Sequence, residues 1–164
     1  RTTPAQKPGR SRQDYATPAD FLASVRARFG LLEFDLAATA ENAVARRFFS
    51  LQDDALARSW EIEEAPLLWL NPPFGYIEPW ARRCAEFRDR REILLLVPAS
   101  VGSCWFERHV FGKAHVAFLT PRFCFDGQAP YPKDCMLCHF GPQIRPGFEI
   151  WNWKKHALVR LDLP

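Results

Sequence analysis

The strongest constraint on the fold is an apolar run, Leu67-Leu68-Trp69-Leu70, that ends abruptly at Asn71-Pro72-Pro73. Four apolar residues followed by two prolines are typical of a buried strand that feeds a loop, because proline cannot continue the hydrogen-bond ladder. A second continuous apolar run spans 93–97. Strands that are apolar on both faces belong to parallel sheets covered by helices, so the two runs predict the α/β class.

Helical segments separate these runs. Thr17-Pro18-Ala19-Asp20 combines a capping hydroxyl, a proline at the first helical position and a carboxylate in the first turn, which predicts a helix over 18–29 that ends at Gly30. Further helices are expected over 41–47, after the capping-box pattern Ser50-Leu51-Gln52-Asp53, from Pro79 onward and over 105–111. Further strands are expected within 31–38 and over 115–119, 123–125, 135–140 and 158–163.

The order of these elements predicts the sheet. Early alternation of strand and helix indicates a mostly parallel sheet with flanking helices, and the shorter links between the later strands indicate an antiparallel C-terminal edge. With 164 residues of which 48% are hydrophobic, we expect one domain over 14–164, preceded by a flexible basic arm over 1–13. The arm holds four positive charges of a chain whose net charge is +3, so contact with a polyanion requires local patches.

Composition and sequence patterns also indicate in which cellular compartment the protein is expected. No apolar run approaches the roughly 18 residues of a membrane span, and the N-terminal segment lacks the apolar region of a secretory signal. The five cysteines are odd in number and lie among apolar residues, which is typical of reduced, buried thiols. These features predict a cytoplasmic protein with no membrane contact, no metal and no obligate protein partner.

The tetrapeptide Asn71-Pro72-Pro73-Phe74 predicts chemistry on a planar amine. The lone pair of such an amine is delocalised, so an enzyme must draw it out of the plane before it attacks. The Asn71 side-chain carbonyl and the Pro72 backbone carbonyl can accept both amine hydrogens, and no charged base is then required. The prolines keep the backbone rigid, and the Phe74 ring can stack on a base swung out of a duplex. A plain proline turn after a strand is the alternative.

Two acids are candidates for holding a nucleotide-like cofactor. Asp35 stands at the end of the first expected strand, where a carboxylate commonly holds a ribose or an ammonium. Asp54 is a second candidate, suited to an adenine amine. A role as a helix cap or as a surface acid is the alternative for each of them.

In these features the chain resembles the small phage and prophage DNA N6-adenine methyltransferases. The resemblance extends from Asp14 to about Phe140. It rests on the ordered series Tyr15-Ala16-Thr17-Pro18, Phe34-Asp35-Leu36-Ala37-Ala38, Glu41-Asn42-Ala43, Phe49, Asp53-Asp54-Ala55-Leu56, Leu70-Asn71-Pro72-Pro73-Phe74-Gly75, Leu96-Val97-Pro98-Ala99, Trp105-Phe106, Phe118-Leu119, Arg122-Phe123 and Ala129-Pro130-Tyr131-Pro132.

The resemblance implies a compact class I, Rossmann-like methyltransferase fold, S-adenosylmethionine as cofactor, and N6 of adenine in DNA as the methyl acceptor. It assigns catalysis to Asn71, Pro72, Pro73 and Phe74, cofactor binding to Tyr15, Thr17, Pro18, Asp35, Ala37, Asp54 and Asn71, and substrate binding to Phe74, Arg122 and Phe125. RNA adenine or a protein glutamine as acceptor is the alternative for an active enzyme. A DNA-binding module of phage origin without turnover is the alternative from another class.

Two other patterns are weaker evidence for a function. Cys135-Met136-Leu137-Cys138-His139 has the spacing of a haem attachment site or of part of a zinc site, but it lies in an expected strand and is better explained by buried thiols. The cluster Phe148, Trp151 and Trp153 with Lys154, Lys155 and His156 is equally consistent with a nucleic-acid contact and with a core edge capped by lysines.

Overall fold

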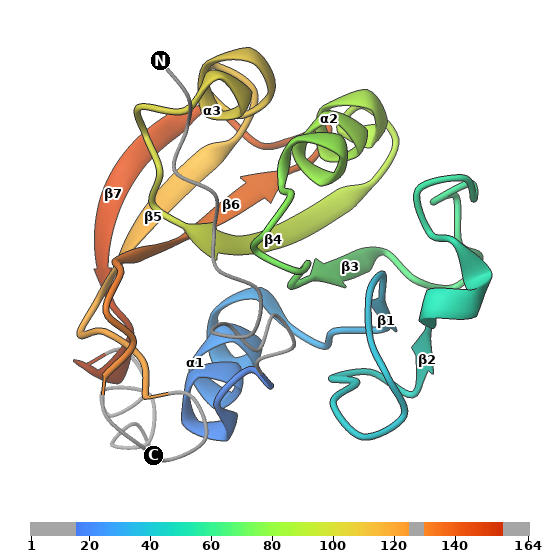
Figure 1. Ribbon diagram of the computed structural model, residues 1–164, viewed down its shortest axis with the longest axis horizontal. Coiled ribbons are helices and arrows are strands. Elements are labelled where there is room, and N and C mark those ends of the chain that lie inside the picture. Colours follow the sequence, from blue (N-terminus) through green and yellow to red (C-terminus); the bar gives the residue numbers. More distant parts are fainter. Residues whose placement is uncertain (1–15, 125–129, 156–164) are drawn as a thin grey trace.

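The computed structural model describes residues 16–124 and 130–155. The described residues form one seven-stranded sheet, which can be followed in Figure 1. The order of the strands across the sheet is β2-β1-β3-β4-β6-β5-β7. Along the chain the elements are α1 (Ala19–Phe29), β1 (Phe34–Asp35), β2 (Arg47–Phe48), the 3-10 helix η1 (Leu51–Asp53), β3 (Leu67–Leu70), α2 (Glu78–Phe87), β4 (Glu92–Pro98), α3 (Cys104–His109), β5 (His115–Thr120), β6 (Cys135–Phe140) and β7 (Gly147–Asn152).

Side chains of β3 and β4 alternate between two hydrophobic cores, one on each face of the sheet. Leu70 and Leu95 belong to the core that includes α2 and α3. Trp69 and Leu94 belong to the core that includes α1. Figure 1 accordingly shows α1 on one face of the sheet and the other two α-helices on the opposite face. The apolar runs are therefore buried on both sides, and the predicted α/β class is confirmed.

The sheet is mostly parallel, as predicted, but the prediction of an antiparallel C-terminal edge was wrong in its position. β6 is the antiparallel strand, and it lies inside the sheet between β4 and β5. The edge strand β7 pairs in parallel with β5. The short link at 141–146 joins β6 to β7, which do not pair, because link length does not determine which strand a returning segment joins. β6 also pairs with β4 over six residues, which places it in the interior.

Most local predictions hold. The first helix spans Ala19–Phe29 and ends at Gly30, whose φ of 101° is in the left-handed region. Its N-cap is Pro18 and no side chain caps it, so the capping by Thr17 expected from the sequence does not form. In the capping box, the Asp53 carboxylate accepts hydrogen bonds from the Ser50 backbone amide and hydroxyl, both at 2.7 Å. The strands at 67–70, 93–97, 115–119 and 135–140 and the helices at Pro79 and 105–111 are present within a few residues.

Three local predictions were wrong. The segment expected to be helical at 41–47 forms a turn and then enters β2, because the Val44 amide donates to the buried Asp35 carboxylate in place of a helical carbonyl. Phe123 and Cys124 lie in an irregular segment, where the Phe123 carbonyl accepts the Tyr131 amide. β7 was not predicted as a strand. The arm at 1–13 and the strand expected at 158–163 lie outside the described residues.

Within the described part of the chain, no helix has the length and apolar character of a membrane span.

Candidate active site

A cavity opens where the order of the strands reverses. From β1 the chain passes to β2 on one side, and it then returns to β3 on the other side of β1. The connections that leave the carboxyl ends of β1 and β3 run to opposite sides, which leaves a crevice between them. In open α/β sheets, ligands usually bind in such a crevice. The cavity measures about 310 Å³. Its lining residues are Thr17, Asp35, Leu36, Ala37, Ala38, Thr39, Asn42, Val44, Phe49, Ser50, Leu51, Asp54, Ala55, Leu56, Trp69, Asn71, Pro73 and Trp80.

Asp35 is the last residue of β1, and its carboxylate holds the backbone that lines one side of the cavity. One of its carboxylate oxygens accepts the Ala37 amide at 3.2 Å, and the other accepts the Val44 amide at 3.1 Å. Burial raises the pKa of Asp35 to about 6, against the lowering effect of these two hydrogen bonds. The carboxylate thus ties both ends of the 37–44 loop to the sheet. Each oxygen has a further lone pair with which to accept a ligand donor.

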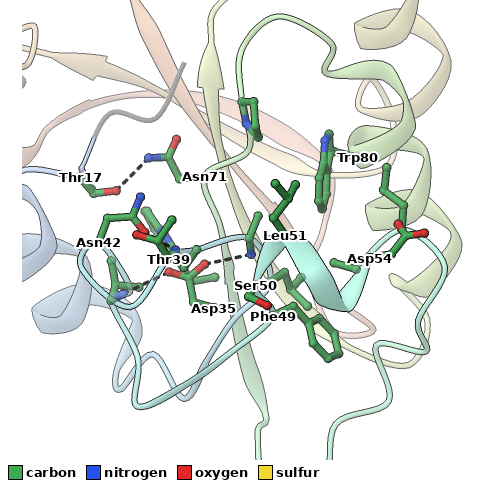
Figure 2. A pocket seen from close by; sticks show the side chains of 18 residues that line it. Thr17, Asp35, Thr39, Asn42, Phe49, Ser50, Leu51, Asp54, Asn71 and Trp80 are labelled. Atoms are coloured by element: carbon green, nitrogen blue, oxygen red, sulfur yellow. Dashed lines mark hydrogen bonds between the residues drawn. The ribbon is translucent and has the colours of Figure 1, made fainter. Parts of the chain in front are cut away.

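Asn71 directly follows β3 and lines the cavity at the end nearest Thr17 (Figure 2). Its side-chain Nδ2 donates a hydrogen bond to Thr17 Oγ1 at 3.1 Å. Pro72 is buried beneath this corner, and Pro73 lines the cavity. Because neither proline has an N–H group, the corner presents hydrogen-bond acceptors from a backbone with restricted motion.

Asp54 and Trp80 lie at the other end of the cavity in Figure 2. Asp54 ends η1 with φ of 49°, a left-handed conformation that Asp tolerates better than most residues do. Trp80 is in the first turn of α2 and is half-buried. An acceptor and a flat aromatic surface therefore stand together, opposite the Asn71 corner.

The structure brings most of the predicted site residues to one place. Thr17, Asp35, Ala37, Asp54, Asn71 and Pro73 all line the cavity. Pro18 does not line it, because it begins α1 by accepting the Leu22 amide on its carbonyl at 3.0 Å. Tyr15 and Phe125 lie outside the described residues. The predicted site residues that line the cavity thus come from segments that are far apart in the sequence.

Phe74 and Arg122 lie apart from the cavity. The Phe74 ring packs on the α1-side core, with its centroid 6.1 Å from that of Tyr131. Arg122 is exposed and forms an ion pair with Asp134 at 2.7 Å. It follows the carboxyl end of β5, which runs parallel to β4, so it lies on the same edge of the sheet as the Asn71 corner.

Sequence reasoning missed several residues of the cavity. Trp80 was not predicted as a site residue, and its place in the cavity follows from the position of α2 rather than from the sequence pattern. Thr39 and Phe49 also line the cavity. Asn42 and Phe49 had a signal only in the family resemblance.

The two cysteines of the pattern at 135–139 lie on opposite faces of the sheet. Cys135 belongs to the core on the α1 side and Cys138 to the opposite core, because residues three apart in a strand face opposite ways. A single haem or metal cannot bind both thiols in this strand. His139 Nε2 instead lies 2.6 Å from Glu92 Oε1. In the described segments no group of three or more His, Cys, Asp and Glu side chains is placed to hold a metal ion.

Not all the cysteines are buried as expected. Cys84, Cys135 and Cys138 are buried, whereas Cys104, at the start of α3, and Cys124, in an irregular segment, are exposed. Burial raises the pKa of the Cys84 thiol well above its usual value, so this thiol is an inert part of the core.

Comparison with known proteins adds a family assignment. A family profile described as DNA N-6-adenine-methyltransferase (Dam) matches residues 5–134. The DNA N-6-adenine-methyltransferase of Escherichia phage T1 is 30% identical over 100 residues, which cover 60% of this chain and 41% of the phage protein. The matched part of the chain therefore spans less than half the length of that relative.

Proposed function

Since this chain belongs to the DNA N-6-adenine-methyltransferase (Dam) family, we propose that it transfers the methyl group of S-adenosylmethionine to N6 of adenine in DNA. The observation that carries the proposal is the cavity at the strand reversal, with the Asn71-Pro72-Pro73 corner at one end. The antiparallel β6 inserted into an otherwise open parallel arrangement is consistent with a class I methyltransferase fold.

The cavity suits S-adenosylmethionine in size and in the chemistry of its lining. Its volume is at the lower end of the roughly 300–1,000 Å³ that ligand pockets occupy. Asp35 is a buried carboxylate whose charged form is poorly solvated, so a cationic methionyl ammonium offsets the cost of its burial. Asp54 would accept the adenine amine of the cofactor, and Trp80 would pack on its ring. When bound, the cofactor supplies a methyl group already activated by a sulfonium.

The Asn71 corner would prepare the acceptor nitrogen. In our proposal the Asn71 side-chain carbonyl and the Pro72 backbone carbonyl accept the two hydrogens on adenine N6. This pairing favours the more tetrahedral nitrogen of the transition state, whose lone pair is free to attack. The rigid backbone keeps the acceptors in place, so no reorganisation is needed as the reaction proceeds.

DNA would approach the carboxyl edge of the sheet. The exposed cations Arg122, Lys133, Lys154 and Lys155 all follow strands, or precede β6, at this edge. Because Arg122 is paired with Asp134, Lys133, Lys154 and Lys155 would supply most of the local positive charge that attracts phosphates. An adenine inside a duplex cannot reach the Asn71 corner, so the target base would be swung out of the stack. Because the Phe74 ring packs against the core apart from the cavity, it would have to move in order to stack on this base.

The pH dependence of cofactor binding tests the role of Asp35. Below its pKa of about 6 the carboxyl is protonated and neutral, so it no longer attracts an ammonium. The ammonium itself stays protonated over this range, because α-amino groups titrate near pH 8. We expect affinity for S-adenosylmethionine, measured by calorimetry, to fall about tenfold from pH 7 to pH 5. Asp35→Asn should bind more weakly at pH 7 and show a flat profile. An equally steep profile in that variant would exclude Asp35 as the titrating group.

Transfer of a labelled methyl group tests the proposed activity directly. The protein is incubated with tritiated S-adenosylmethionine and, in separate reactions, duplex DNA, RNA and a protein mixture. We expect label in DNA alone, and in N6-methyladenine after digestion to nucleosides. Label in RNA or protein would change the acceptor class. A protein that binds the cofactor but labels none of the three would support a binding module without turnover.

A further inference from the structure

We propose that Thr17 is a positioning residue that holds the Asn71 amide with its carbonyl directed to the substrate amine. This inference rests on the proposed function of Asn71. It gives the Thr17 hydroxyl a role other than contact with the cofactor. The observation behind it is the hydrogen bond from Asn71 Nδ2 to Thr17 Oγ1, 3.1 Å long, between side chains 54 residues apart in the sequence.

Thr17 is held in place by the helix that follows it. The Pro18 carbonyl accepts the Leu22 amide, so the first turn of α1 begins one residue after Thr17. Phe21 and Val25 of this helix are fully buried in the core beneath the sheet. Trp69 of β3 belongs to the same core, and β3 leads directly into Asn71. The packing that docks α1 therefore also fixes the distance between the two side chains.

An asparagine side chain needs such a partner because its amide can rotate by 180°. The two orientations have nearly the same shape, but only one presents a carbonyl oxygen to an amine that donates hydrogens. The other would place the Asn71 NH₂ group against the substrate NH₂ group, a donor facing a donor. In the structure the Thr17 hydroxyl accepts a hydrogen bond from the Asn71 NH₂ group, and in this arrangement the Asn71 carbonyl points away from Thr17 and can accept from the substrate amine (Figure 2).

Thr17→Val and Thr17→Ser separate this role from packing. Valine has nearly the shape of threonine but no acceptor, whereas serine keeps the hydroxyl and loses a methyl group. We expect Thr17→Val to lower kcat about tenfold, the factor that corresponds to one neutral hydrogen bond. Affinity for S-adenosylmethionine should change by less than about twofold, which is well below the contribution of one hydrogen bond. Thr17→Ser should recover most of the kcat.

A second readout does not depend on turnover. The side-chain amide signals of Asn71 are identified in a nitrogen-15 correlation spectrum by their loss in Asn71→Ala. In Thr17→Val these signals should shift toward those of an amide exposed to solvent, whereas in Thr17→Ser they should remain near their wild-type positions. Ser24→Ala is the matched control, because it removes a hydroxyl from α1, the helix that follows Thr17, at a position outside the cavity lining. It should leave kcat and the Asn71 signals unchanged.

Three results would overturn the role of Thr17. These are unchanged Asn71 amide signals in Thr17→Val, a kcat loss that Thr17→Ser or Ser24→Ala reproduces, and a loss confined to cofactor affinity. If the wild-type protein transfers no methyl group to DNA, the proposed function fails. The amide signals then decide by themselves whether Thr17 holds Asn71.

Discussion

Asn71→Ala is expected to lower methyl transfer to DNA by at least about 100-fold, the loss typical when one preorganised polar group that stabilises a transition state is removed. The alanine variant lacks the side-chain carbonyl that accepts one of the two amine hydrogens, and the Pro72 carbonyl alone cannot replace it. The residues proposed to hold the two ends of the cofactor, Asp35 and Asp54, are unchanged in this variant. Cofactor affinity should therefore stay within about threefold of wild type, the scale of one weak hydrogen bond. Tritium transfer gives the rate and calorimetry gives the affinity.

The matched control for this variant is Gln143→Ala. It removes a primary amide from an exposed residue in the turn between β6 and β7, at the opposite edge of the sheet from the cavity. This variant should retain wild-type turnover. Turnover of Asn71→Ala close to that of Gln143→Ala would show that the corner does not act on the acceptor nitrogen.

The second large effect is expected for Asp35→Ala, which should weaken cofactor binding by about 100-fold, the lower end of the cost of breaking a buried ionic pair. The cofactor ammonium loses its counter-charge. The Ala37 and Val44 amides lose their acceptors as well, so the 37–44 loop that lines the cavity is no longer tied to β1. Calorimetric titration with S-adenosylmethionine at pH 7 measures the change. Turnover at cofactor concentrations near the wild-type dissociation constant should fall in proportion.

Melting temperature is a poor readout for Asp35, because two effects on the free energy of unfolding oppose each other. Removing the carboxylate abolishes the cost of burying a charge, but it also leaves two amide groups without their acceptors. Asp89→Ala is the matched control, since Asp89 is an exposed carboxylate beyond the end of α2. If Asp35→Ala binds cofactor as tightly as Asp89→Ala does, the cavity does not hold the cofactor ammonium at Asp35.

Local signals predicted the elements whose structure is set locally. The helix at 18–29 has its own start and stop residues, and the runs at 67–70 and 93–97 are apolar on both faces. The turn at Asn71-Pro72-Pro73 was predicted for the same reason, because a strand that ends in two prolines must turn there. The place of Asp35 at the end of a strand also followed from the sequence.

Tertiary contacts decided what the sequence could not predict. The alanine-containing stretch at 41–47 favours a helix by propensity. The Val44 amide instead donates a hydrogen bond to the Asp35 carboxylate, and the chain continues into β2. β1 and β2 have only two residues each, too few for a hydrophobic period to be visible. β7 combines exposed Phe148 and Ile150 with buried Trp151, and only its pairing with β5 makes it a strand. Trp80 reaches the cavity because of where α2 is placed.

A crystal structure with the product S-adenosylhomocysteine tests most directly whether the Asn71 corner and the cofactor share one cavity. The proposal predicts the ligand in the crevice between β1 and β3, with its amino group at Asp35 and its adenine between Asp54 and Trp80. Its sulfur should face the Asn71 side chain. A ligand bound elsewhere, or one whose sulfur faces away from Asn71, would contradict the proposal.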